Sequence, residues 1–288
     1  MRMADRMTRS LPFIKATACG NDFLLIEGEL VPEQERKSIT QRICDRHNGV
    51  GADGVEWLFP TDKAEVYAHL INSDGSDAEV SGNGTRCVAA AHVWKNLGQY
   101  QRPPEDLNDL LTTIGTQGGV RVLTDAGVKT CTLVRQRQNE FEFRSDMGEP
   151  KIDGEISVAL RNGAVRGIKL STGNPQFIRF VDEFPSDWLV EAAEIEAHRD
   201  FPQHTNVEYV KVMGPQEIEI RVFERGAGET QSSGTGSCAS AVASIYSKRV
   251  NSPMRVVAPG GPQTVEWDGG SIFLTGPAQI LCRGEFFS

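Results

Sequence analysis

Two short segments of this sequence, each rich in glycine and opened by a serine, have the composition of a ligand-binding turn. They are residues 81–85 (SGNGT) and 233–237 (SGTGS), and each runs into an alanine-rich stretch with a helical pattern. The first N–H groups of a helix have no intrahelical partner, and the aligned peptide dipoles add partial positive charge there, so a carboxylate is stabilised. Glycine leaves space for a ligand to approach the backbone. The two segments therefore predict carboxylate binding at two helix starts.

The serine that opens each segment, Ser81 or Ser233, is placed to act on the carbon atom next to such a carboxylate. If both turns hold one carboxylate, the serines flank its α-carbon from opposite sides, as needed to remove a proton from one face and return it on the other. The α-proton of an amino acid is a weak acid, so this reaction needs electrostatic help and a well-placed base. A thiolate suits that role, because its pKa of about 8.5 falls further at a helix N-terminus, whereas a serine alkoxide is far less accessible. The arrangement predicts proton transfer at carbon by two groups, one on each face, although a serine hydroxyl is a poor base.

The two segments belong to an internal echo of the sequence. Aligned without gaps, the stretches share alanine at positions 89/241 and 91/243, and carry similar residues at 93/245 and 94/246. A glycine-rich helix start alone can be a tight turn with an N-cap. Its recurrence predicts two related halves, each of which presents one such helix.

The elements that must position these turns are short strands and a few helices. The alternating apolar pattern predicts strands at 23–26, 65–71, 120–124, 129–134, 141–143, 165–170, 208–212, 217–223 and 271–274. The helical pattern predicts helices at 33–45, 82–97, 187–198 and 234–248. The sequence has no strand–GxGxxG–helix unit, so it predicts an α+β fold rather than a doubly wound nucleotide-binding fold.

The composition limits the kinds of partner. A chain of 288 residues is long for one domain and natural for two. Its formal net charge of −9 and its lack of a basic stripe disfavour nucleic acid. No apolar run is long enough to span a membrane, and residues 1–10 lack the apolar core of a secretory signal, so we expect a frayed leader and a cytoplasmic protein. The six cysteines form no metal-ligand pattern, and we expect no metal and no cofactor.

Individual side chains have simpler interpretations too. Cys87 and Cys238 are expected to be small buried residues, and His47 and His69 structural ones. Any single asparagine in a loop is most often a turn or capping residue. Glu224 and Arg225 have two interpretations: a ligand-binding pair, or the solvated end of a strand.

In order along the chain, the sequence resembles the motifs of the diaminopimelate epimerase family. The matching segments are residues 20–23 (GNDF), 46–54 (RHNGVGADG), 72–76 (NSDGS), 81–87 (SGNGTRC), 173–175 (GNP), 206–207 (NV), 224–230 (ERGAGET) and 233–236 (SGTG). The resemblance runs from about residue 13 to the C-terminus. It implies two similar domains, each a barrel-like β-sheet around a central α-helix, with the active site in the interdomain cleft. The expected domains are 1–126, completed by a C-terminal strand at about 277–288, and 127–276. A homodimer is a further expectation.

The same resemblance implies roles for particular residues. It makes Ser81 and Ser233 the catalytic acid and base. The groups that hold the reacting α-carboxylate would be the backbone N–H groups of Gly82, Asn83, Gly234 and Thr235. The groups that hold the rest of a diaminopimelate, an amino-acid substrate with two such ends, would be Asn21, Asn72, Asn174, Asn206, Glu224 and Arg225. These types fit a zwitterion, because a carboxylate accepts from an ammonium and a guanidinium binds a carboxylate through two hydrogen bonds.

Three departures from the family pattern concern the reaction. Serine stands at both positions where the family has its catalytic cysteines. Gln176 stands where the family usually has a histidine, and Gly54 where many members have a glutamine that contacts the substrate. The sequence therefore leaves three functions open: an epimerase that is inactive or strongly impaired as written, an amino-acid-binding homologue without catalysis, and a related isomerase or dehydratase.

Overall fold

In the computed structural model, which describes residues 9–78, 80–97 and 119–288, the chain divides into two units. The first comprises the described residues up to Phe143 together with Ala278–Ser288, and the second comprises Arg144–Pro277. The boundary therefore lies at 143/144 rather than at the expected 126/127. The reason is that the strand that follows residue 126 pairs with the strand before it, so the hairpin stays in the first unit.

The first unit is a closed barrel. Its strands are β1 (Ser10–Ala18), β2 (Asn21–Glu27), β3 (Gly54–Phe59), β4 (Val66–Asn72), β6 (Val120–Thr124), β7 (Gly127–Arg137), β8 (Glu140–Asp146) and most of β17 (Phe273–Phe287), with a short β5 (Asp77–Ala78) beside β4. The strand order follows this sequence, and β17 pairs with both β8 and β1, which closes the ring. The pairs β2–β3 and β4–β6 are parallel.

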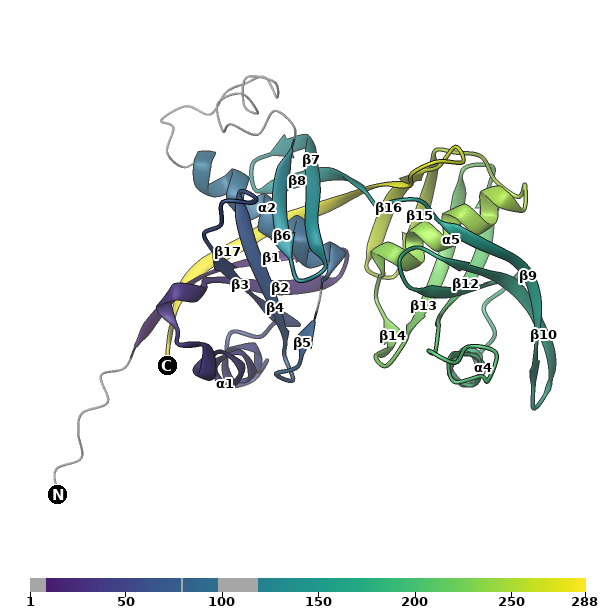
Figure 1. Cartoon of the computed structure of the whole chain (residues 1–288), viewed down its shortest axis with the longest axis horizontal. Helices are drawn as coiled ribbons and strands as arrows, with labels where there is room; N and C mark the ends of the chain where they lie inside the picture. Colours follow the sequence, from purple (N-terminus) through teal and green to yellow (C-terminus); the bar gives the residue numbers. More distant parts are fainter. Residues whose placement is uncertain (1–8, 79, 98–118) are drawn as a thin grey trace. The chain divides into compact units, whose positions relative to one another are not determined.

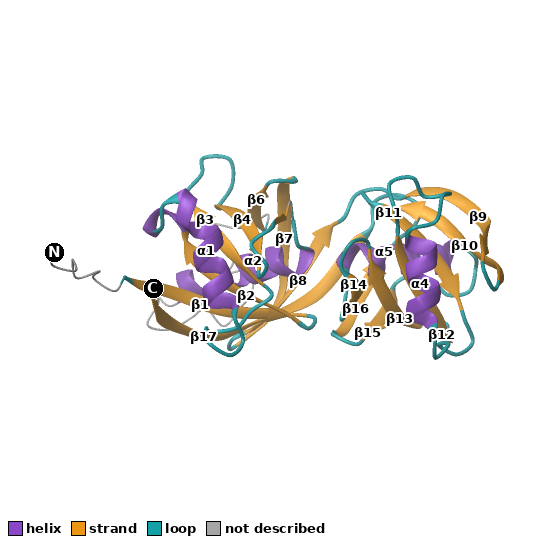
Figure 2. Cartoon of the chain, turned by 90° about the horizontal axis from the view of Figure 1, so that it is seen from below, coloured by secondary structure: helices purple, strands orange, loops and turns teal. Residues whose placement is uncertain are grey.

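A helix occupies the centre of this barrel. α2 (Gly82–Leu97) buries residues on every side, and its core neighbours come from all eight strands of the ring. A helix that is apolar all round is suited to such an interior, and its run of alanines lets the strands approach closely. α1 (Glu33–Cys44) instead packs outside against β3 and β4, and a short 3-10 helix η1 (Gly28–Leu30) precedes it. Figures 1 and 2 show the inner and the outer helix.

The second unit repeats this arrangement. Its strands are β9 (Lys151–Leu160), β10 (Gly163–Ser171), β11 (Pro175–Phe180), β12 (Asn206–Gly214), β13 (Glu217–Glu224), β14 (Gly228–Thr230), β15 (Met254–Ala258), β16 (Gly261–Glu266) and the start of β17. The pairs β11–β12 and β13–β15 are parallel. Backbone hydrogen bonds join the two ends of the sheet, from Met147 N to Ile272 O (2.8 Å) and from Ile272 N to Gly148 O (2.9 Å). α5 (Gly234–Tyr246) fills the core and α4 (Trp188–Glu196) packs outside.

The two units therefore have equivalent elements. The order β1, β2, α1, β3, β4, β5, α2, β6, β7, β8 recurs as β10, β11, α4, β12, β13, β14, α5, β15, β16, β17. This duplication confirms the α+β fold with two similar domains, each a barrel-like sheet around a central helix. It also explains the internal echo, because the two repeated segments open the two central helices.

Most of the expected elements are present. The four predicted helices are found, with ends that differ by at most two residues. The predicted strand at 271–274 overlaps the start of β17, which begins at Phe273 and is much longer. β1 begins at Ser10, the last residue of the expected leader, and residues 1–8 lie outside the described residues. Within the described residues, no helix is long and apolar enough to cross a membrane.

Candidate functional site

Both serine turns are N-caps of the central helices. The Ser81 hydroxyl oxygen accepts a hydrogen bond from Gly84 N at 3.0 Å, and the Ser233 oxygen accepts one from Gly236 N at 3.2 Å. Ser233 has an extended backbone (φ −135°, ψ 128°), as N-cap residues usually have. The sequence forms these caps because a serine stands three residues before a glycine whose N–H would otherwise lack a partner.

Space beside each turn is left open by its first glycine. A Cβ atom added at Gly82 would meet nothing within 4 Å, and one at Gly234 would meet only Leu274 Cδ2, at 3.4 Å. Thr172 Oγ1 donates to the carbonyl oxygen of Thr235 at 3.3 Å and fixes the second turn. The backbone at each helix start is therefore accessible to a small anion.

In the first unit, two of the predicted substrate-binding residues are in direct contact. Asn83 Nδ2 donates to Asn21 Oδ1 at 2.6 Å, across 62 positions of sequence. Arg86, one turn further along α2 and 2% exposed, donates to Asn83 Oδ1 and lies 3.7 Å from Cys19 Sγ. The side chain of Asn83 is thus held from both of its ends. Asn21 and Asn83 form one polar cluster at the start of α2.

The other end of Asn21 is held by the 46–54 motif. Asn21 Nδ2 donates to Asp53 Oδ2 at 3.1 Å, and Asp53 Oδ1 is 2.8 Å from Arg46 Nη2. Asp22 completes the network, since its carboxylate binds Arg46 at 2.7 Å and Lys15 at 2.9 Å. Burial alone would raise the pKa of Asp22, but the hydrogen bonds from Arg46 and Lys15 lower it. This motif positions Asn21 through charge-assisted bonds.

Asn72 lies at the same edge of the sheet. The register pairs Gly54 with both Phe23 and Asn72, so the starts of β2 and β3 and the end of β4 are neighbours. Asn72 Nδ2 donates to Ser76 Oγ at 3.0 Å, and Asn72 N donates to Ser76 O at 2.8 Å. Within the described residues Asn72 therefore has a turn-forming role, which is the simpler of its two interpretations.

In the second unit, Asn206 fixes the backbone at Arg225. Asn206 is 4% exposed, and its Oδ1 accepts a hydrogen bond from Arg225 N at 2.8 Å. The Arg225 side chain is exposed and donates from Nη1 to Gln203 O at 3.0 Å. The preceding residue, Glu224, accepts from Thr230 Oγ1 at 2.7 Å. Burial raises the pKa of Glu224, against the effect of that hydrogen bond, so a bound ammonium group would stabilise its charged form.

Gln176 links the asparagines of this unit. It is fully buried on β11, and its side-chain amide lies 2.8 Å from that of Asn174. The same amide lies 2.8 and 3.1 Å from the two carboxyl oxygens of Glu208, and 3.1 Å from Asn206 Nδ2. The residue at this departure from the family pattern is thus a connecting group between Asn174, Asn206 and Glu208.

Two buried carboxyl groups, Glu56 and Glu208, were not identified from the sequence. They lie 3% and 0% exposed beneath the starts of α2 and α5. Burial and the charge of Asp125 raise the pKa of Glu56 to about 8, and burial and the charge of Glu224 raise the pKa of Glu208. One signal was available: each is a glutamate at the third position of an apolar strand, at equivalent places in the two halves.

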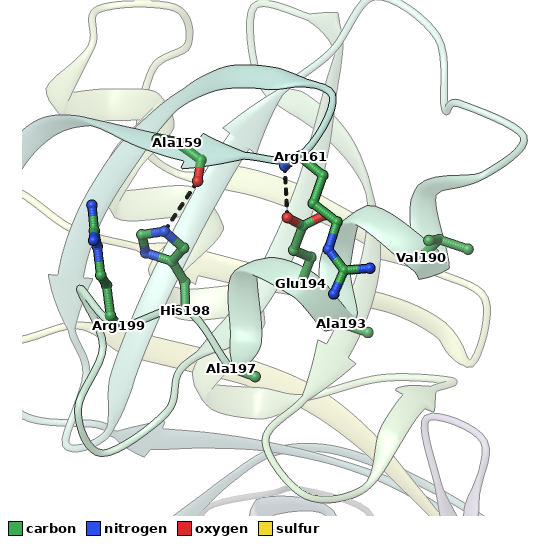
Figure 3. Close-up of a pocket in the computed structure, with 8 residues that line it drawn as sticks. All are labelled: Ala159, Arg161, Val190, Ala193, Glu194, Ala197, His198 and Arg199. Atoms are coloured by element: carbon green, nitrogen blue, oxygen red, sulfur yellow. Dashed lines mark hydrogen bonds between the residues drawn. The ribbon is translucent and has the colours of Figure 1, made fainter.

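A surface hollow of about 740 Å³ lies elsewhere on the second unit and contains none of these residues. Figure 3 shows two hydrogen bonds in it: His198 Nε2 is 3.1 Å from Ala159 O, and Arg161 N donates to Glu194 Oε1 at 2.7 Å. It is a packing groove between β9 and α4. Among the described residues, no group of three or more His, Cys, Asp or Glu side chains could hold a metal ion.

The chain matches the family model described as diaminopimelate epimerase over residues 13–152 and 168–281. It is 35% identical over 292 residues to the diaminopimelate epimerase of Heliobacterium modesticaldum, covering 96% of this chain and 99% of the relative. The corresponding protein of Synechococcus elongatus is 36% identical over 288 residues, with 96% and 98% covered.

Solved structures share the fold at low identity. A phenazine biosynthesis protein of the PhzF family from Bacillus anthracis aligns with a TM-score of 0.68 at 14% identity, covering 97% of this chain and all of that one. A hydroxyproline epimerase from Agrobacterium vitis aligns with a TM-score of 0.65 at 16% identity, covering 98% and 92%. These two likenesses concern the fold alone.

Proposed function

Because this chain belongs to the diaminopimelate epimerase family, a family of amino-acid epimerases, we propose that it acts on diaminopimelate, interconverting the LL and meso forms without a cofactor. The observation that carries the proposal is the pair of serine-capped, glycine-rich helix starts, one in each unit. The reaction would serve the synthesis of lysine and of peptidoglycan precursors, and a cytoplasmic location belongs to the same proposal.

The reacting α-carboxylate is assigned to the two helix starts. The N–H groups of Gly82 and Asn83 would bind it from the first unit, and those of Gly234 and Thr235 from the second. Support comes from the open space at both leading glycines and from the dipole of each helix.

The remainder of the substrate is assigned to the polar side chains. Glu224 and the asparagine carbonyls would accept from the ammonium groups, and Arg225 would bind the distal carboxylate. The anchoring of Arg225 N by Asn206 supports this assignment, because it sets where the guanidinium begins. The buried side-chain amide of Gln176 lies beside both Asn174 and Asn206.

Proton transfer is assigned to Ser81 and Ser233. One serine oxygen would take the α-proton as the Cα–H bond breaks, and the other would give its proton to the opposite face as the new bond forms. A serine must approach an alkoxide to do this, whereas the family's cysteine is readily ionised. We therefore expect the chain as written to be strongly impaired in catalysis.

A second function is favoured by one observation. Each serine oxygen is occupied as an N-cap acceptor, which is a structural role that needs no catalysis. An amino-acid-binding homologue that holds diaminopimelate without turning it over has the same site. A related isomerase or dehydratase is a third alternative.

Incubation of the whole chain with LL-diaminopimelate in deuterium oxide separates these functions. Exchange of the α-hydrogen with inversion supports the epimerase, and calorimetric binding without exchange supports the binding homologue. Loss of water or a shifted double bond would indicate the third alternative. Failure to bind diaminopimelate at all would exclude the first two.

A further inference from the structure

Glu56 and Glu208 occupy equivalent places in the two units. Each is the third residue of its strand, and the register pairs Glu56 with Leu25 and Glu208 with Ile178 on the equivalent parallel neighbours. Each reaches the third residue of a central helix. The same acid therefore stands beneath both serine turns.

The contact with the turn is close in both units. Glu56 Oε1 lies 2.1 Å from the point that a Cβ atom of Gly84 would occupy, and Ser81 Cβ lies 3.2 Å from that point. At Gly236 the corresponding distances are 2.6 Å to Glu208 Oε1 and 3.1 Å to Ser233 Cβ. The carboxyl group thus shares the first helical turn with the serine, on the side that glycine leaves free.

We propose that Glu56 and Glu208 are positioning residues that must be uncharged for the two helix starts to hold a carboxylate. The inference rests on the function proposed above, since it takes the α-carboxylate of the substrate as the anion. A carboxylate ion beneath the turn would compete with the ligand for the same partial positive charge and would repel it in a medium of low dielectric. An uncharged carboxylic acid does neither.

The groups around Glu56 favour its neutral form. Asp125 adds negative charge, and its carboxylate is engaged by His69 of β4, whose Nδ1 lies 2.7 Å from Oδ2. From α2, Cys87 is a buried thiol whose pKa is raised, so it brings no charge. Arg86 of the same helix directs its guanidinium to Asn83 and Cys19.

The groups around Glu208 favour the same state. α5 carries no charged side chain, and its Cys238 is buried. β13 brings Glu224, whose negative charge opposes ionisation of Glu208. β11 brings Gln176, a neutral amide that can bond to either form of the acid. The burial that raises the pKa of both glutamates acts in the same direction.

Proton linkage gives the inference a measurable signature. Binding of a carboxylate beside a partly ionised Glu56 makes the neutral form more favourable, so the protein takes up a proton as it binds. With a pKa of about 8 for Glu56, affinity should fall roughly tenfold between pH 7 and pH 9. Glutamine keeps the shape of glutamate and cannot ionise. In Glu56→Gln, position 56 should therefore contribute little to the pH dependence of the affinity for diaminopimelate.

The experiment is calorimetry of LL-diaminopimelate with the whole chain from pH 6.5 to 9, in two buffers of different ionisation enthalpy. Glu56→Gln, Glu208→Gln and the exposed-site control Glu140→Gln are measured alongside. We expect proton uptake in the parent chain and in Glu140→Gln, and less uptake in Glu56→Gln. Glu208→Gln should bind as tightly as the parent chain at pH 6.5, because glutamine keeps the uncharged form. The ligand's own amino groups titrate equally in all four proteins, so the differences belong to the glutamates.

Infrared spectra of the unliganded parent chain provide a readout that needs no variant to fold. Ordinary carboxyl groups are ionised at pH 6.5, so an absorption of protonated carboxyl is expected from the buried acids, with the contribution of Glu56 lost toward pH 9.5. Its absence at pH 6.5 would overturn the inference. Binding of diaminopimelate with equal proton uptake in all variants would overturn the inference alone, whereas no binding at pH 6.5 would overturn the proposed function as well.

Discussion

Oε1 of Glu56 lies 2.1 Å from the point where Gly84 would carry a Cβ atom, closer than side-chain atoms approach in folded proteins. Alanine at this position must therefore displace a buried carboxyl group. We expect Gly84→Ala to lower the free energy of unfolding by about 1–3 kcal/mol, the usual effect of overpacking. Denaturation in urea measures it.

Gly82→Ala is the matched control, because a Cβ atom there meets nothing within 4 Å. Alanine is favoured over glycine within a helix, so this variant should be unchanged or more stable by about 0.5–1 kcal/mol. Equal destabilisation by both substitutions would mean that Glu56 does not determine the glycine requirement.

The buried acid at position 56 should also make stability depend on pH. Its pKa is raised from 4.5 to about 8 by folding, so between these values the folded state binds more protons than the unfolded state. Stability from this group is then greatest below pH 4.5, falls as the pH rises toward 8, and changes no further above it. Urea denaturation at pH 5.5 and 7.5 should show a smaller loss in Glu56→Gln than in the parent chain. A parallel loss in both proteins would contradict the raised pKa.

Restoring the family's thiols should restore proton transfer. The double variant Ser81→Cys with Ser233→Cys places two readily ionised groups at helix N-termini, where thiolates are stabilised. We expect the rate of α-hydrogen exchange to rise by orders of magnitude over the parent chain. Because two opposite faces must be served, each single variant should fall well short of the double one. An unchanged rate in the double variant would show that other groups carry the reaction.

Binding should depend on Arg225 even without turnover. Replacing Arg225 with alanine removes the charge-assisted bonds proposed for the distal carboxylate, a loss of about 1.5–3 kcal/mol or roughly ten- to a hundredfold in Kd. Alanine used as the ligand, an amino acid without a distal carboxylate, should be affected much less. Calorimetric titration of both ligands against both proteins measures the difference. Equal losses would instead assign Arg225 to the fold or to the α-carboxylate.

The central helices could be predicted from sequence because their signals are local. A serine three residues before a glycine, followed by an alanine-rich stretch, specifies both the cap and the burial of α2 and α5. The ordered motifs gave the two-domain fold by resemblance. The contact between Asn21 and Asn83 has no such local signal, since it joins positions 62 apart in the chain.

Several strands lacked a readable pattern for the same kind of reason. β1 contains Pro12, β9 contains Gly154 and β16 is a short segment with Gly261 and Pro262, so each breaks the alternation that indicates a strand. These segments become strands because they pair with neighbouring strands in the sheet. The boundary at 126/127 was misplaced because β7 belongs with β6 through pairing rather than through any change in composition.

The strand β17 has a consequence for how the protein is made. Its first residues pair with β16 in the second unit, and its later residues, Gln279 to Phe287, pair with β1 at the other end of the sequence. A ribosome releases β1 before the second unit and the later part of β17 after it. The barrel of the first unit therefore lacks one strand, and cannot close, until the second unit has been synthesised. The order of synthesis and the order in which the two barrels can be completed are thus opposite.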